Sequence, residues 1–347
     1  MLVSTLLLLL VDPVEFKPVL TLADVPAEQE LYLQNVLHIE IDDKGRFYAS
    51  DFPSARVFYW NPDGSYAGYF GSKGEGPGEY SFAASLGPPM GYVNVLDDKI
   101  YIYDGGSRMV SVLDRSFKFI KRVTFEGLGG KINNFHVLEE DRFLFYDSYF
   151  CEKKACRRLL VYDDKGTLLQ TWMESPDLTW AADESNGRVN LYIWEPIPVV
   201  DFSRSRNQAV VAHSSRPLIE LWSPAGEKKR SLTLDIPRKA VTRDDIDEYN
   251  DQDWVKGNES VKIIFPDEKD YFDQVLTTNA GYLVYHMSPL YGIADGYLVD
   301  WNGKVQGRFT LPCGEGGTLY APRGRIMAAI VDEEGEFILR ELTIEKP

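Results

Sequence analysis

The sequence predicts an all-β fold, namely a six-bladed β-propeller made of four-stranded antiparallel blades. Short segments of alternating apolar and polar residues recur along the whole chain, and turn residues separate them. The 28 Gly and 19 Pro among 347 residues indicate many such turns. Matching turns at Asp98 and Asp141 are 43 residues apart, which suits one propeller blade of ~40 to 45 residues.

Residues 36–70 form the clearest copy of the repeat, VLHIEIDDKGRFYASDFPSARVFYWNPDGSYAGYF. An alternating strand leads to a turn at 42–45, and a second strand ends at Asp51. A loop to Arg56, a third strand, a turn at 61–64 and a fourth strand complete the unit. This order predicts a four-stranded antiparallel meander.

Five further copies follow, and their first strands lie near residues 93, 135, 198, 274 and 318. The sixth copy ends after three strands, whereas residues 15–22 form an unassigned strand-like stretch at the other end of the chain. Pairing these two ends would complete the last blade and remove two exposed sheet edges. We therefore expect an N-terminal strand to close the ring.

Residues 45–80 carry the most specific motifs, namely GRFYASD, Arg56-Val57, NPDG and GSKGEGPGEY. This segment resembles an NHL-type repeat, and the whole chain resembles the bacterial six-bladed β-propeller proteins that carry such repeats. The resemblance implies a six-bladed fold and an exported protein. It does not imply a particular biochemical role, because most members of that group have none assigned.

The N-terminus carries an apolar run at residues 2–11, which is too short for the roughly 20 residues of a membrane-spanning helix. Its length suits the core of a signal peptide, although no Lys or Arg precedes it and no small-residue cleavage site follows. We expect an export-signal-like segment at 1–12 and one propeller domain at 13–347; the alternative is an unusual apolar first strand. The expected location is extracytoplasmic: periplasmic, secreted or envelope-associated.

Three cysteines are too few for a disulfide scaffold. Cys151 and Cys156 lie in a segment that resembles a hairpin and could form one local disulfide in an exported protein. Zinc binding by this pair lacks a second pair of ligands.

The charge balance is acidic, because 37 Lys and Arg stand against 53 Asp and Glu and give a formal net charge of −16. Nucleic-acid binding needs clustered basic residues, so this class of function is disfavoured. Cationic or neutral ligands are favoured, and a monomer without a transmembrane span is expected.

The long segments of the chain all fall on one predicted face of the propeller. They lie between the second and third strands of a blade or between blades, at residues 71–92, 148–157, 174–196, 238–273 and 288–295. Because loops on a rigid scaffold carry function, we predict that this face binds the ligand. The insertion at 238–273, between blades four and five, contains a predicted helix at 242–256 that Thr242 can cap; it is either a lid or a surface helix.

Four side chains are predicted at matching places near the ends of second strands: Tyr103, Tyr146, His213 and His286. Such positions can converge on a central channel, where His213 and His286 could bind a metal or act as general bases. Alternatively, these side chains cap strands or pack between blades. His38 and His136 lie on first strands, where we expect satisfied interior histidines.

Arg56 and Arg108 follow Asp51 and Asp104 at a repeated spacing, which favours structural ion pairs over catalysis, although both arginines also lie on the predicted ligand-binding face. Three tryptophans lie in the long segments, where exposed rings can anchor a peptide or sugar or simply pack against the ring: Trp180, Trp194 and Trp254.

These observations favour a non-catalytic extracytoplasmic propeller that recognises a protein, peptide or glycan partner on the long-loop face. The alternative is a metal-dependent enzyme, a lyase or lactonase-type hydrolase, with a divalent metal held by His213 and His286 at the channel mouth. No other cofactor is predicted, and no local motif of a nucleophilic hydrolase occurs in the sequence.

Overall fold

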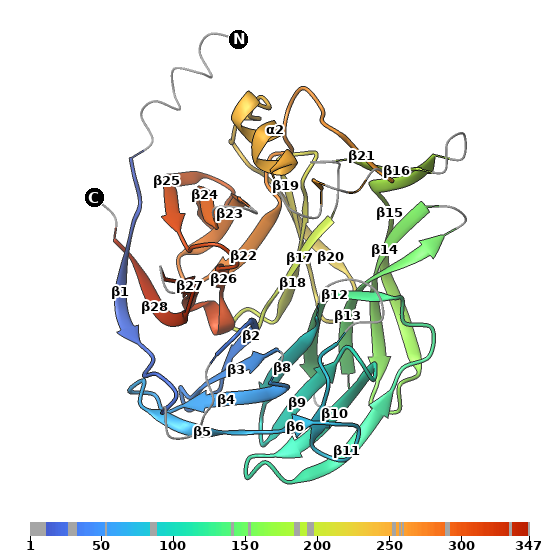
Figure 1. The fold of residues 1–347 in the computed structure, drawn as a ribbon, viewed down its shortest axis with the longest axis vertical. Coiled ribbons are helices and arrows are strands. Elements are labelled where there is room, and N and C mark those ends of the chain that lie inside the picture. The colour runs from blue at the N-terminus through green and yellow to red at the C-terminus, as the bar shows by residue number, and fades with distance from the viewer. Residues whose placement is uncertain are drawn as a thin grey trace.

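The structure is a computed structural model that describes residues 12–26, 33–52, 54–83, 89–139, 142–151, 154–183, 188–192, 198–251, 255–256, 258, 260–288, 292–332 and 335–345. Six β-sheets lie around a common centre, and the first strand of each sheet is nearest to it (Figure 1). The chain passes from sheet to sheet in sequence order, so the predicted propeller of six blades is confirmed.

Each blade is an antiparallel meander whose strands follow one another from the centre to the rim. Blade 1 contains β2 (Val36–Ile41), β3 (Phe47–Asp51), β4 (Arg56–Trp60) and β5 (Tyr66–Phe70). Blade 2 contains β8 (Gly91–Leu96), β9 (Lys99–Asp104), β10 (Met109–Asp114) and β11 (Phe119–Thr124). Blade 3 contains β12 (Lys131–Glu139), β13 (Arg142–Cys151), β14 (Lys154–Asp163) and β15 (Leu168–Asp183).

The second half of the ring repeats this order. Blade 4 contains β17 (Pro198–Ser203), β18 (Gln208–His213), β19 (Leu218–Trp222) and β20 (Lys228–Thr233). Blade 5 contains β22 (Gln274–Thr278), β23 (Gly281–Met287), β24 (Ile293–Val299) and β25 (Val305–Pro312). Blade 6 contains β26 (Thr318–Tyr320), β27 (Ile326–Val331) and β28 (Phe337–Glu345), and a short two-stranded sheet of β6 (Ser72–Lys73) and β7 (Glu79–Tyr80) lies between blades 1 and 2.

An N-terminal strand, β1 (Glu15–Thr21), supplies the outer strand of blade 6, as the sequence predicted. It pairs antiparallel with β28, so that Phe16 lies opposite Ile344 and Thr21 opposite Arg340. The two ends of the chain thereby share one sheet. The edge of β28 that would otherwise be open is paired with β1.

Buried apolar side chains fill the space between every pair of neighbouring blades. Six clusters exist among the described residues, one for each interface around the ring. Between blades 6 and 1, for example, Met327 and Leu339 pack with Phe58 and Trp60. Because strands are buried on both faces between neighbours, their sequences are continuously apolar at many positions rather than strictly alternating.

The hairpins between third and fourth strands are short, and those of blades 1, 3, 4 and 5 have glycine at a left-handed position, where blade 2 has Phe117. In blade 3 the Asp163 carboxylate accepts hydrogen bonds from the backbone N–H of Lys165 and Thr167. Gly166 has φ +82°, and a Cβ there would lie 1.7 Å from the Thr124 carbonyl oxygen of blade 2. Glycine is therefore required both by the turn and by the neighbouring blade.

Blade 3 has longer strands than the other blades. Parts of two segments predicted as loops, 148–157 and 174–196, therefore belong to strands. Within residues 148–157, β13 pairs with β14 as far as Cys151 and Lys154. The strand β15 continues to Asp183 and pairs with a further strand, β16 (Arg188–Tyr192). The insertion returns one strand, β21 (Val261–Ile264), which pairs parallel with β16 and makes blade 3 a six-stranded sheet.

The predicted helix of the insertion is present but shorter, as α2 (Arg243–Asn250). Thr242 and Asp245 form a reciprocal capping box at its N-terminus, in which each side chain accepts from the backbone N–H of the other residue. Lys269 forms an ion pair with Asp245, and Glu248 accepts from Ser288 of blade 5, so the helix is tied to the ring. In the described part of the chain, no helix has the length and apolar character needed to cross a bilayer.

We expect Leu22→Ala to weaken the ring closure. Leu22 directly follows β1, is 3% exposed and packs in the cluster between blades 6 and 1. Its truncation should lower the free energy of unfolding by about 2 to 4 kcal/mol, measured by urea denaturation. Val19→Ala on β1 is the matched control, because Val19 is 57% exposed; equal losses in both variants would contradict a buried closure.

Candidate functional site

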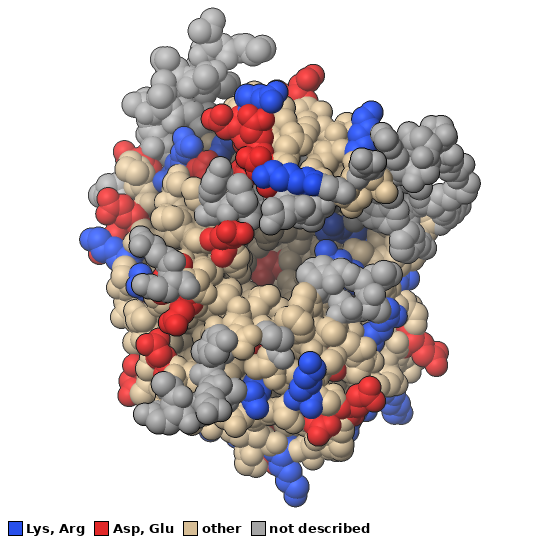
Figure 2. All heavy atoms as spheres, in the orientation of Figure 1, with Lys and Arg blue, Asp and Glu red and all other residues tan. Residues whose placement is uncertain are grey.

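The first strands of the six blades surround a central channel of about 650 Å³. Figure 2 shows it as a hollow at the centre of the face seen in Figure 1, with acidic atoms inside the hollow. The lining includes residues from all six first strands and the turns that follow two of them. The channel therefore exists only because the ring is closed.

On three of these strands, two side chains with polar atoms that line the channel are separated by one position. Since side chains alternate across a strand, two residues separated by one position share the inner side. The pairs on β2, β12 and β26 illustrate this pattern: His38 with Glu40, Asn134 with His136, and Thr318 with Tyr320. Register shifts occur between Val36 and His38 and between Ile132 and Asn134, and such bulges re-aim the side chains beside them.

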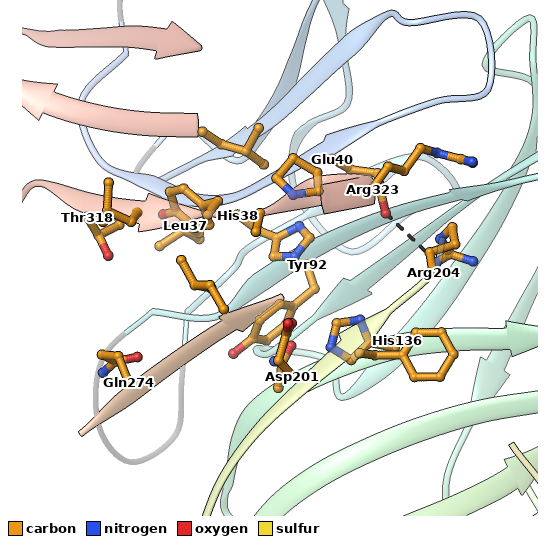
Figure 3. Close-up of a pocket in the computed structure, with 18 of the residues that line it drawn as sticks. Leu37, His38, Glu40, Tyr92, His136, Asp201, Arg204, Gln274, Thr318 and Arg323 are labelled. Carbon is orange, nitrogen blue, oxygen red and sulfur yellow. Dashed lines mark ion pairs between the residues drawn. The ribbon is translucent and has the colours of Figure 1, made fainter. Parts of the chain in front are cut away.

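A cluster of three charged residues forms the floor of the channel, at the end with the short turns. Arg204, in the turn after β17, lies with Nη2 3.9 Å from Glu40 Oε2, as Figure 3 shows. It also donates to the Val137 carbonyl at 3.1 Å and to Asn94 Oδ1 at 2.9 Å. This guanidinium of blade 4 thus joins blades 1, 2 and 3.

Arg323 supplies the second guanidinium of the floor from η3 (Pro322–Gly324) of blade 6. Its Nε donates to the Ile41 carbonyl at 2.6 Å, and Nη2 donates to the Val95 carbonyl at 3.3 Å. Arg323 has φ +52°, a left-handed conformation that is strained for a side chain of this size. The two contacts across the ring hold it there.

Above the floor lies a middle tier, which we define as His38, Tyr92, His136, Asp201 and Tyr320. Figure 3 shows His38, Tyr92, His136 and Asp201 of this tier gathered around the channel, with Gln274 and Thr318 toward the mouth. The His38 ring packs edge-on against Tyr92 at 5.4 Å and Tyr320 at 6.2 Å between centroids. His136 lies 5.5 Å from the Phe202 ring.

Burial keeps both histidines of the middle tier neutral. It lowers the pKa of His38 to about 4. The Val93 carbonyl acts to raise this pKa, and the positive charge of Arg204 lowers it further. Burial also lowers the pKa of His136 well below its usual value. His38 Nδ1 and His136 Nε2 are buried without a hydrogen-bond partner among the described residues, and the expectation that both are satisfied interior histidines stays a prediction.

Asp201 is the carboxylate of the middle tier. Its Oδ2 accepts from the Thr277 backbone N–H at 2.7 Å, which ties blade 4 to blade 5. Desolvation raises the pKa of this carboxyl, and hydrogen bonds from Thr277 and Phe202 oppose the shift. Within the described residues, no Lys, Arg or His forms an ion pair with it.

The two histidines predicted as metal ligands contact different carboxylates. His213 Nε2 lies 3.5 Å from Glu220 Oε2. His286 Nδ1 lies 3.5 Å from Asp273 Oδ2, in a smaller cavity of about 220 Å³ beneath α2. Among the described residues, no three His, Cys, Asp or Glu side chains come together in a group that could hold a metal ion. The metal hypothesis for His213 and His286 stays a prediction.

Tyr103 and Tyr146 lie in the cores between blades. Tyr103 is 1% exposed and packs against Phe135 and Phe145. Tyr146 donates to the Pro198 carbonyl and is 4% exposed. Strand pairing places His213 opposite Pro198, level with Asp51, Asp104 and Asp147, which lie opposite Val36, Gly91 and Ile132. His213 is therefore out of register by one residue with the two tyrosines.

The repeated aspartates hold the incoming crossovers of their blades. Asp51 accepts from the backbone N–H of Gln34 and Asn35, and the Arg56 guanidinium lies instead over the Tyr69 ring at 4.9 Å. Asp104 accepts from the Phe82 N–H at 2.8 Å, and the Arg108 N–H donates to the Asp104 carbonyl at 2.8 Å.

Blade 3 keeps an Asp–Arg pair of the predicted kind. Arg158 binds both carboxylate oxygens of Asp147, at 3.0 and 2.7 Å. Asp147 also accepts from the Gly129 backbone N–H at 2.6 Å. The structural role expected for the repeated aspartates fits these contacts.

The remaining candidates lie at the far end of blade 3 and in the insertion. Trp180 is part of β15, but its side chain lies outside the described residues, as do Trp194 and Trp254 entirely. Cys151 and Cys156 are joined by a disulfide near the tip of the β13–β14 hairpin, with 5.8 Å between Cα atoms. Cys313 is a buried thiol.

Sequence reasoning missed the channel lining, although a signal for it exists. The first strands of blades 1, 3 and 4 each carry a polar residue flanked by apolar ones, as in HIEI, NFHVL and VVDF. In a propeller the first strand is innermost, so such residues face the axis. The histidines on first strands were therefore better candidates than those at the ends of second strands.

We expect the free energy of unfolding to fall as the pH is lowered from 7 to 5. The unfolded chain protonates His38 and His136 near the usual pKa of about 6.5, whereas the folded channel disfavours the protonated forms. For His38, with a folded pKa of about 4, the loss is about 2 kcal/mol. Glu40 and Asp201 act in the opposite sense, because protonation relieves the desolvation that raises their pKa.

Urea unfolding at three pH values would test this dependence in the wild type and in a variant that carries His38→Asn and His136→Asn. The variant should show a flatter dependence, and His213→Asn outside the channel should follow the wild type. An unchanged dependence in the double variant would contradict the assignment.

Comparison with known proteins agrees with this architecture. Residues 25–178 match a protein-family model described as a 6-bladed beta-propeller. No curated protein matches the sequence. Among solved structures, a candidate exported protein from Bacteroides fragilis NCTC 9343 superposes with a TM-score of 0.58 at 15% identity over 96% of both chains. A member of the DUF4221 family from Bacteroides vulgatus ATCC 8482 superposes with a TM-score of 0.51 at 9% identity, over 97% of this chain and 99% of the other.

At these identities the likeness concerns the fold alone, and the resemblance to NHL repeats stays a prediction. Sheet order, ring closure, the family match and both superpositions agree on one conclusion: the chain is a six-bladed β-propeller.

Proposed function

We propose that this protein is an extracytoplasmic binding propeller that takes a peptide, protein segment or glycan into the mouth of its central channel, on the face with the long segments. The single observation that carries the proposal is the pair of buried ring nitrogens without hydrogen-bond partners, His38 Nδ1 and His136 Nε2, in a channel of about 650 Å³. Buried polar atoms are normally satisfied, so unpartnered ones in a cavity suggest a ligand or solvent that completes them.

The position of the mouth supports recognition of a partner larger than a metabolite. First strands begin on the side where the crossovers and the β13–β14 and β23–β24 connections lie. In Figure 1, the helix α2 and strands β16 and β21 lie at the top of the view, beyond blades 3 to 5. A partner that extends from the channel over these blades would also meet these elements.

The lining favours binding over nucleophilic chemistry. Among the described residues that line the channel there is no Ser, Cys or Lys, the side chains that most often form covalent intermediates. The charged groups of the floor are engaged with main-chain carbonyls and with each other. These groups position the blades rather than a substrate.

Two observations support an extracytoplasmic location. The Cys151–Cys156 disulfide is of a kind that persists in oxidising compartments. The name of the Bacteroides fragilis protein with a similar fold also refers to export.

Binding to peptide and glycan arrays would test the proposal. Thr318 lines the channel where β26 begins, so Thr318→Tyr would narrow the mouth. We expect this variant to bind the array ligands of the wild type at least tenfold more weakly. Asp63→Tyr is the control, since Asp63 is exposed in a short turn on the opposite face. Thermal unfolding would verify that both variants fold.

Ligands that bind Thr318→Tyr as tightly as the wild type would show that the channel mouth is not the site. A wild-type protein that binds nothing on either array would contradict the proposed class of partner.

A further inference from the structure

We propose that the middle tier of the channel is a site for a primary ammonium group, which Asp201 and the acceptor atoms around it would bind. This inference rests on the proposed function and names the chemical group that the channel recognises. It follows from which hydrogen-bonding atoms of the channel are already engaged and which are left.

The donors of the middle tier are largely committed to main-chain carbonyls. Tyr92 Oη donates to the Ile132 carbonyl at 3.2 Å, and Tyr320 Oη donates to the Val36 carbonyl at 3.0 Å. The Val93 carbonyl acts on the pKa of the His38 imidazole in the direction that favours a proton on the ring nitrogen facing it. These three side chains therefore offer lone pairs, and not protons, to a ligand.

The atoms that remain are acceptors with one exception. His38 Nδ1 has no hydrogen-bond partner among the described residues, and in a neutral imidazole whose proton lies on the side of the Val93 carbonyl this nitrogen can accept a hydrogen bond. Each tyrosine hydroxyl keeps a lone pair after donating its hydrogen. His136 is the exception, since its neutral ring carries one N–H and one acceptor nitrogen. A ligand that completes this set must bring several hydrogen-bond donors.

The charge of the channel points to a cation rather than to a neutral donor. Of the four charged groups that line it, Glu40, Arg204 and Arg323 belong to the floor, where Arg204 is the ion-pair partner of Glu40. Asp201 has no counter-ion within the described part of the chain and accepts only backbone and Thr277 hydrogen bonds. A buried carboxylate is stabilised when a cation pairs with it.

The floor arginines do not supply that cation. Figure 3 shows the Arg204 and Arg323 head groups on the side of the channel away from Gln274 and Thr318, beyond His38. Their contacts are to Val137, Asn94, Ile41 and Val95. An ammonium group would therefore enter from the mouth and stop at the middle tier.

The two tyrosine rings and the pKa of Asp201 support the same assignment. Aromatic faces attract cations within about 6 Å of the ring centroid, and Tyr92 and Tyr320 flank His38 in this tier. Desolvation raises the pKa of the Asp201 carboxyl, and an adjacent cation would offset that effect.

The channel is much larger than an ammonium group, so the rest of the ligand would extend toward the mouth. A small diffusible amine and the lysine side chain of a peptide present the same chemical group. The experiment below separates these two sources.

Isothermal titration calorimetry of the full chain at pH 7.5 would compare three probes of equal length: 1,5-diaminopentane, 1,5-pentanediol and glutarate. We expect the diamine to bind at least tenfold more tightly than the diol, and glutarate not to bind. A capped Gly-Lys-Gly peptide, with its Nζ-acetylated form as control, tests the lysine source. Tighter binding of this peptide than of the diamine would assign the site to a peptide.

Asp201→Asn should weaken diamine binding at least tenfold, whereas Asp63→Asn, which removes the same charge from an exposed turn, should leave it unchanged. Tyr320→Phe keeps the ring and removes the hydroxyl, so we expect a loss of about two- to fivefold. It keeps the inference testable if Asp201→Asn does not fold.

Three results would overturn the ammonium assignment. The diol or glutarate could bind more tightly than the diamine, and Thr318→Tyr could abolish that binding. The channel would then be a ligand site for another chemical class. Zn²⁺ or Ca²⁺ binding that is lost in Asp201→Asn and excludes the diamine would make the middle tier a metal site. No binding of any amine probe would remove the assignment, and the array experiment would then decide separately whether the channel binds ligands.

Discussion

The antiparallel pairing of β1 with β28 is the interaction on which the channel depends. Every blade contributes its first strand to the lining, so an open ring would separate Tyr320 of blade 6 from His38 of blade 1. The floor arginines add to this closure from the inside, since Arg204 and Arg323 reach across to strands of other blades. Apolar clusters between blades stabilise the ring, and the closure together with polar contacts between first strands fixes its centre.

The architecture was predictable from sequence because it follows from local patterns. Turn residues such as Gly45 and Gly64 have the left-handed φ that their hairpins need, and the strand at residues 15–22 had no partner other than the last copy. Thr242 also had the spacing of a capping residue. Each of these features depends on a few neighbouring residues, so a single sequence contains enough information.

The site was less predictable because it depends on register and on convergence. A one-residue difference in pairing placed His213 level with the repeated aspartates instead of the tyrosines. His38, His136 and Asp201 come from three blades, and although each is a polar residue of an apolar first strand, the sequence does not show that they line one channel. The extension of blade 3 was missed for a similar reason, since β16 pairs with β21 from a distant insertion.

The parallel pairing of β16 with β21 also constrains the order in which the chain can fold. The partner of β16 follows the whole of blade 4 in the sequence, so blade 3 keeps an open edge until residue 264 has been synthesised. Non-local strand pairs of this kind form slowly and leave edges exposed to aggregation in the meantime. We therefore expect blades 3 and 4 and the insertion to fold together, and the unpaired edge of β16 to be the strand edge that a chaperone on the emerging chain would meet.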